Sequence, residues 1–207
     1  MGNSHADGPP TDGPLADEPA RWPVASSRDV YREPSPFAVR ADVVQRPGHE
    51  DEDGFTRLVL EHPGAVVVLA VDEQDRAVCL RQYRHPVGGR LVELPAGLCD
   101  VQDEEPRAVA ARELQEEVGL AAADWRHLGS LWSSPGVSAE QHHYFLARDL
   151  TDVGRGDFEL EHEEAEMEVF RVPVADLRDA VLDGRVQDGP VALAVLLADA
   201  RGLLPTH

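Results

Sequence analysis

The chain has 207 residues, of which 42% are hydrophobic, so it can form one domain of ordinary size with a buried core. Its formal net charge of −20 opposes attraction to nucleic acid and to anionic membranes, and we expect neither as a partner. There is no apolar run long enough to cross a bilayer and no secretory signal, and the two cysteines do not form a CxxC pair, so we expect a reduced, cytoplasmic setting.

The first part of the chain divides into a tail and a strand-rich segment. Residues 1–22 are rich in Gly, Pro and Asp and are expected to form a disordered tail. Residues 23–62 are expected to form an N-terminal β segment, with strands at 37–45 and 55–61 around the loop RPGHEDEDG. The remaining residues, 63–207, are then expected to form the main domain.

The main domain begins with strands. Residues 64–85 are predicted to form a hairpin, because two apolar runs flank the polar turn DEQDR, and residues 91–95 form a short strand. The clearest helix covers 106–120, from Pro106 to a stop at Gly119. Its predicted buried stripe is Ala108, Val109, Ala111, Leu114 and Val118.

The rest of the domain contains more strands and then helices. Strands are predicted at 125–133, 141–147 and 169–172, and helices at 174–184 and 190–202. This order favours a mixed α/β sandwich over a regular alternation of strand and helix.

Acidic residues are concentrated on the first helix. Glu113 and Glu117 are four residues apart and share a face, and Glu116 borders it. Their repulsion would be relieved by a hard divalent cation, which prefers oxygen ligands. Arg112 can pair with Glu116 and fix that carboxylate. Because such clusters are often only solvated helix faces, the flanking residues decide between the two interpretations.

The flanking residues resemble the Nudix box. Gly97 opens the pattern, Glu104 follows, and after seven intervening residues comes Arg112-Glu113-Leu114-Gln115-Glu116-Glu117-Val118-Gly119-Leu120. One departure is visible: six residues rather than five separate Gly97 from Glu104, so that Asp103 occupies the regular position. The extra residue falls in a loop, which absorbs insertions readily.

This resemblance implies a fold and a chemistry. Nudix domains are α/β/α sandwiches with a mixed sheet, and they cleave nucleoside diphosphates linked to another group with Mg²⁺ or Mn²⁺. It implies that Glu113 and Glu117 are metal ligands, with Glu116 as a third and the carbonyl of Ala96 as a fourth. Glu116 and Arg112 are also expected to serve catalysis.

A second resemblance, to ADP-ribose pyrophosphatases, lies beyond the box. Pro135 is 16 residues after Gly119, within a Ser-Pro-Gly loop. This resemblance implies that Gly136 approaches the substrate and that Glu140 forms hydrogen bonds with the terminal ribose hydroxyls. On its own, Ser-Pro-Gly is typical of an ordinary turn.

The stretch QYRHPVGGRLVELPAG (82–97) is similar to the same enzymes. It implies that Arg84 contacts substrate phosphate or ribose and that Glu93 lines the site. A surface salt bridge for Arg84 and a paired buried carboxylate for Glu93 remain open. Phe37 and Arg57 are predicted adenine contacts, although core packing and surface charge are the simpler interpretations of each.

An acidic stretch, ELEHEEAEMEVF (159–170), precedes the last strand. In the family such a loop supplies the base that takes a proton from the attacking water and also reaches the metals. Glu164 is the first choice for this base and metal ligand, with Glu163 and Glu166 as rivals.

The predicted reaction is hydrolysis of ADP-ribose to AMP and ribose 5-phosphate by a homodimer that associates through its N-terminal β segment. Another nucleoside-diphosphate sugar, such as GDP-mannose, remains an alternative substrate. A non-catalytic ADP-ribose sensor is a second alternative, opposed by the complete box carboxylates, and an acidic interaction module is a third.

Overall fold

The computed structural model describes residues 15–34, 36–156 and 166–205. Among these residues, ten strands form three sheets, and three helices pack against them. No helix in these ranges is both long and apolar enough to cross a membrane.

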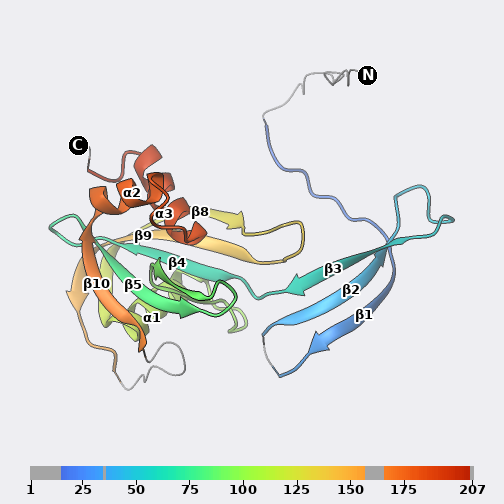
Figure 1. The fold of residues 1–207 in the computed structure, drawn as a ribbon, viewed down its shortest axis with the longest axis horizontal. Coiled ribbons are helices and arrows are strands. Elements are labelled where there is room, and N and C mark those ends of the chain that lie inside the picture. Colours follow the sequence, from blue (N-terminus) through green and yellow to red (C-terminus); the bar gives the residue numbers. More distant parts are fainter. Residues whose placement is uncertain (1–14, 35, 157–165, 206–207) are drawn as a thin grey trace.

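The N-terminal sheet stands apart from the rest of the chain at one end of the molecule (Figure 1). It is antiparallel, in the order β1-β2-β3, and its strands are β1 (Val24–Arg32), β2 (Ala38–Val44) and β3 (Phe55–Glu61). The sequence predicted β2 and β3 but missed β1. All nine residues of β1 are exposed, so the strand has no apolar alternation and forms through pairing with β2.

The central sheet has four strands in the order β7-β4-β9-β8. They are β4 (Ala65–Ala70), β7 (Ala96–Leu98), β8 (Leu120–Trp132) and β9 (Gln141–Asp152). β4 pairs with β9 in parallel, whereas the other pairs are antiparallel, which makes the sheet mixed. This confirms the mixed sheet expected from the sequence.

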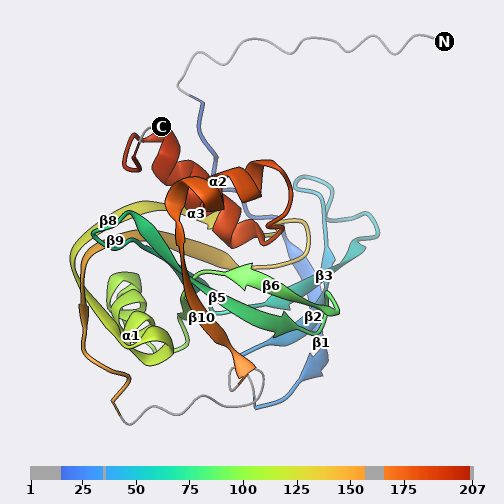
Figure 2. The ribbon, with the colours of Figure 1, turned by 60° about the vertical axis from the view of Figure 1, so that its left-hand side comes forward.

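Helices cover both faces of this sheet (Figure 2). Strand β4 is buried along its whole length and alternates between the two sides. Val66 and Val68 join a cluster with α1 (Pro106–Val118). Val67 and Leu69 join a cluster with α2 (Val174–Leu182) and α3 (Gly189–Ala200). The result is the predicted α/β/α sandwich.

The third sheet has the order β10-β5-β6, with strands β5 (Arg76–Arg84), β6 (Gly89–Glu93) and β10 (Glu168–Pro173). The hairpin predicted for 64–85 is therefore wrong. β4 and β5 lie in different sheets, and only one bridge, Val71 to Ala77, joins them. The turn forms as expected, but β4 is the inner strand between β7 and β9, so β5 pairs with β6 and β10 instead.

Helix α1 agrees with its prediction apart from details. It ends at Val118, and Gly119 adopts φ 72° and donates its N–H to the carbonyl of Gln115 at 2.8 Å. The buried side chains include Val109 and Leu114 as predicted, but Ala110 is buried where Ala108 was expected. The helix is thus rotated slightly, which brings Glu117 to its buried face.

Candidate active site

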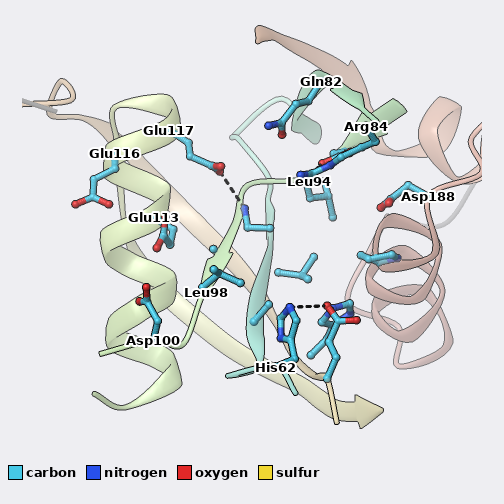
Figure 3. Close-up of a pocket in the computed structure, with 18 of the residues that line it drawn as sticks. His62, Gln82, Arg84, Leu94, Leu98, Asp100, Glu113, Glu116, Glu117 and Asp188 are labelled. Carbon is cyan, nitrogen blue, oxygen red and sulfur yellow. Dashed lines mark hydrogen bonds and ion pairs between the residues drawn. The ribbon is translucent and has the colours of Figure 1, made fainter. Parts of the chain in front are cut away.

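A cavity of about 570 Å³ lies between α1, the β6–β7 connection and the beginning of α3 (Figure 3). Its lining combines one acidic wall with mixed polar groups opposite. The lining residues are Phe37, His62, Ala65, Val67, Gln82, Arg84, Glu93, Leu94, Ala96, Gly97, Leu98, Asp100, Arg112, Glu113, Glu116, Glu117, Glu140, His142, Asp188 and Pro190.

The acidic wall is the face of α1 that carries Glu113, Glu116 and Glu117. Glu117 is 7% exposed, and its Oε2 accepts a hydrogen bond of 2.9 Å from the N–H of Ala96 in β7. Arg112 donates to Glu113 at 2.7 Å and to Glu116 at 2.9 Å, the second being the contact that the sequence suggested. The guanidinium therefore offsets the repulsion between carboxylates and orients two of them.

Gly97 is explained by its contact with this wall. A Cβ at residue 97 would lie 2.0 Å from Cδ of Glu113 and 2.3 Å from its Oε1, closer than real Cβ contacts. Only glycine lets β7 pass so near the carboxylate. The first residue of the motif is therefore required by the placement of Glu113.

The irregular spacing before the helix is also resolved. An oxygen of Glu104 lies 3.5 Å from Arg112, and this buried Oε2 has no hydrogen-bond partner. Asp103, at the regular spacing, is exposed and has φ 62°. The extra residue is thus accommodated at Asp103, and Glu104 keeps its place beside Arg112.

The acidic wall suits a hard cation. Carboxylates and the backbone of Ala96 provide only oxygen ligands, as Mg²⁺ and Ca²⁺ require. Across residues 15–34, 36–156 and 166–205, however, no three carboxylate, imidazole or thiol groups converge into a complete ion site. The donors therefore fit a cation that also takes ligands from water and from a bound diphosphate.

Across the cavity, Arg84 and Glu93 form a bidentate salt bridge. Nε of Arg84 donates to Oε1 at 2.8 Å, and Nη2 donates to Oε2 at 2.6 Å. The side chain of Glu93 is 7% exposed and that of Arg84 is 47% exposed. Both interpretations left open by the sequence hold in part, because the carboxylate of Glu93 is buried and paired while the guanidinium of Arg84 still faces the cavity.

Asp188 caps α3 beside this pair, and its carboxylate accepts a hydrogen bond of 2.9 Å from the N–H of Val191. Burial raises the pKa of Asp188 to about 6, opposed by the bond from Val191, while Glu93 raises it further.

The third side of the cavity carries Glu140, just before β9. Burial alone would raise its pKa, but hydrogen bonds from Ser133 and His142 outweigh burial and hold the pKa below its usual range. Glu140 is therefore ionised at neutral pH. Phe37 reaches the same side, with its ring centroid 5.0 Å from that of His62.

Most of the predicted site residues thus meet in one cavity: Phe37, Arg84, Glu93, Ala96, Arg112, Glu113, Glu116, Glu117 and Glu140. Two do not line it. Arg57 is exposed and packs over the ring of Phe55 at 4.4 Å, and Gly136 lies exposed in its loop. Their roles stay predictions.

The candidate bases lie at the edge of the described chain. Glu163 and Glu164 fall outside the described residues. Glu166 is exposed, and its carbonyl accepts a hydrogen bond of 3.0 Å from Arg90.

Several lining residues were not predicted from the sequence, among them His62, Gln82, Asp100, His142 and Asp188. One signal was available: Glu140, His142 and Tyr144 alternate along one strand face. Asp188 before Gly-Pro is a recognisable helix cap. His62 and Gln82 carry no local signal, because only the tertiary fold brings them to the cavity.

Comparison with known proteins agrees with this geometry. The NUDIX domain model matches residues 61–193. An ADP-ribose pyrophosphatase of Mycobacterium tuberculosis is 45% identical over 163 residues, 78% of this chain and 75% of that protein. An ADP-ribose pyrophosphatase of Bacillus subtilis is 37% identical over 139 residues, 67% of this chain and 74% of that protein.

A solved structure described as an ADP compounds hydrolase has a TM-score of 0.69, with 22% identity, over 91% of this chain and 100% of that one. That likeness supports the fold. The family match, the two relatives and the acidic wall opposite Arg84 together show that this chain belongs to the Nudix family, in the group that contains ADP-ribose pyrophosphatases.

Proposed function

We propose that the protein is a hydrolase that cleaves the diphosphate of ADP-ribose to AMP and ribose 5-phosphate, with Mg²⁺ as its divalent cation. The observation that carries this proposal is the cavity itself, in which the acidic wall of α1 lies across from Arg84, and Glu140 lines the same space. Its volume of about 570 Å³ falls in the ordinary range for small-molecule sites. The two relatives provide the choice of substrate.

The acidic wall would hold the cation through Glu113, Glu116, Glu117 and the carbonyl of Ala96. When bound, a divalent cation neutralises charge on the diphosphate and lowers the pKa of a coordinated water. Arg112 keeps Glu113 and Glu116 oriented, and the N–H of Ala96 does the same for Glu117. Arg112 thus acts through the carboxylates and is a positioning residue.

The opposite side would place the substrate. Arg84 is held in one orientation by its two bonds to Glu93, and its remaining N–H groups are suited to a phosphate oxygen. Glu140 is an ionised acceptor for the hydroxyls of the terminal ribose. Phe37 would offer an aromatic surface to the adenine ring. Gly136 and Arg57 would need a loop movement or a second subunit to reach the substrate.

The base that activates water is proposed to be Glu164, which would also reach the cation, with Glu163 and Glu166 as rivals. A base must lie within hydrogen-bond reach of the water, directly or through another water. Separate Gln substitutions at the three positions would identify it, because only the base should cause the large loss of kcat.

A homodimer built through the N-terminal sheet is also proposed, with residues 23–62 as the associating segment and 63–207 as the catalytic domain. Several large apolar side chains of this segment are about half exposed: Val24, Val30, Tyr31 and Leu58. Apolar area of this kind favours burial against a partner. Sedimentation of the intact chain and of a chain lacking residues 1–62 tests this assignment by comparing their oligomeric states. A cytoplasmic location remains a prediction.

The function is tested by product analysis. Purified protein is incubated with ADP-ribose and Mg²⁺, with EDTA in a parallel sample, and phosphorus NMR follows the products. We expect AMP and ribose 5-phosphate in the first sample and unchanged ADP-ribose in the second. Binding of ADP-ribose without turnover would instead support a sensor.

A further inference from the structure

The carboxylate of Glu140 lies between two imidazoles that the proposed mechanism does not use. Nε2 of His142 is 2.8 Å from its Oε1, and Nε2 of His62 is 3.3 Å from the same oxygen, the contact drawn in Figure 3. Ser133 donates its hydroxyl to Oε2. The imidazoles are 9% exposed at their side chains, so this arrangement is largely closed to water.

The backbone fixes the tautomer of His62. The N–H of Gly64 lies 3.0 Å from Nδ1, which must accept, so the proton of a neutral ring is on Nε2 and points at Glu140. Gly64 itself has φ 93°, a backbone conformation that residues with a Cβ rarely adopt. Burial lowers the pKa of His62, although Glu140 opposes the shift, so the ring is neutral at physiological pH.

The tautomer of His142 is fixed from its other side. Nδ1 lies 3.1 Å from the hydroxyl of Tyr144, and burial raises the pKa of Tyr144 to about 12, so this hydroxyl stays protonated and can donate. A carboxylate only accepts hydrogen bonds, so Nε2 of His142 carries the proton that faces Glu140. Both rings therefore donate from Nε2 to the same oxygen.

These contacts leave Glu140 with a defined property. Two N–H groups engage Oε1 and one hydroxyl engages Oε2, so the carboxylate is held in one orientation and has remaining acceptor capacity on Oε2. Asp188, at the start of α3, adds a negative charge nearby. A group that binds here must therefore donate hydrogen bonds, as sugar hydroxyls do.

We infer that His62 and His142 are positioning residues for the terminal sugar: they hold Glu140 as a fixed acceptor and so select substrates whose terminal group carries donor hydroxyls. The inference rests on the proposed function and extends it to two residues outside the Nudix box. His62 follows β3 directly, and backbone hydrogen bonds of Leu60 with Val137 and Ala139 hold this end of the N-terminal segment close to Glu140.

Steady-state kinetics of four variants tests the inference. His62→Leu and His142→Leu remove a donor, whereas His62→Gln and His142→Gln keep an N–H group near the position of Nε2. We expect each Leu variant to raise the KM for ADP-ribose about tenfold, the usual effect of losing one hydrogen bond to a charged group, with a smaller effect in the Gln variants. His49→Leu, an exposed histidine in the β2–β3 loop, is the matched control.

Inhibition by AMP separates positioning from general damage. AMP lacks the terminal sugar, so its inhibition constant should stay within about twofold of wild type in all four variants, because no bond to the sugar is involved. If the Leu variants raise the inhibition constant of AMP as much as the KM for ADP-ribose, or if the Gln and Leu variants have the same KM, the inference is wrong. If wild-type protein does not cleave ADP-ribose at all, the proposed function fails instead.

A measurement on the wild-type protein does not depend on the folding of variants. Nitrogen NMR of ¹⁵N-histidine in the Mg²⁺-loaded protein at neutral pH distinguishes the two neutral tautomers from the imidazolium. We expect His62 to be neutral with its proton on Nε2 and His142 to carry a proton on Nε2, each signal being assigned by its loss in the matching Gln variant. A charged His62, a neutral His62 with its proton on Nδ1, or a His142 without a proton on Nε2 would overturn the inference.

Discussion

Replacing Gly97 by alanine should damage catalysis more than stability. The added Cβ would lie 2.0 Å from Cδ of Glu113, whereas real Cβ contacts are rarely below 3.0 Å. The carboxylate of Glu113 or the β7 backbone must therefore move by at least about 1 Å, a displacement that can cost about 100-fold in rate when a catalytic group is involved.

The cost in stability should be smaller, because the clash involves the far end of a side chain that can rotate. Overpacking of this kind costs about 1–3 kcal/mol. In a chain of this size such a change lowers Tm by no more than about 12 °C. We therefore expect folded protein with kcat reduced about 100-fold and a higher Mg²⁺ requirement.

The matched control is Gly89→Ala in β6, where a Cβ would meet no atom within 4 Å. Both variants are assayed with ADP-ribose over a range of Mg²⁺ concentrations, alongside thermal unfolding. If Gly97→Ala keeps kcat within about threefold of wild type, the close approach of β7 does not position Glu113, and the reasoning fails.

Three further predictions follow from the same geometry. Glu117→Gln should raise the Mg²⁺ concentration needed for half-maximal activity, measured by metal titration. The increase should exceed the roughly 10–100-fold that is typical when a residue supporting a metal ligand is replaced. An unchanged Mg²⁺ requirement would show that Glu117 is not a metal ligand. Arg84→Ala should lower the free energy of unfolding by about 2–3 kcal/mol in urea, because Glu93 is buried, and adding Glu93→Gln should recover part of that loss. The pKa of Asp188 rises from 3.8 to about 6 on folding, so its charged form destabilises the fold increasingly as pH rises through that interval. Asp188→Asn keeps the cap but has no charge to bury, so its free energy of unfolding should rise relative to wild type by about 1–2 kcal/mol as the pH increases from about 4 to about 7. A difference in unfolding free energy that does not change with pH would refute this.

The acidic helix was predictable because its information is local. Glu113, Glu116 and Glu117 lie within one and a half turns of α1, and helical periodicity alone places them on neighbouring faces. Gly119 likewise marks the end of the helix by its own conformation. The motif residues therefore gave both the helix and the metal-binding prediction.

Pairing between strands was less predictable because it depends on partners far along the chain. The turn at DEQDR is visible in the sequence, but β4 pairs with β9, more than seventy residues later, rather than with β5. Strand β1 has no buried residue to reveal it. The same limit hid His62, whose role depends on contact with Glu140, a residue 78 positions later that lies just before β9.

The central claim is that ADP-ribose is the preferred substrate of this cavity. A competition assay tests it most directly: equal concentrations of ADP-ribose, GDP-mannose and NADH are mixed with the purified protein and Mg²⁺, and the loss of each is followed by chromatography, which ranks their kcat/KM values. The account predicts that ADP-ribose disappears first and yields AMP with ribose 5-phosphate. Preferential loss of GDP-mannose or NADH, with ADP-ribose remaining, would contradict it.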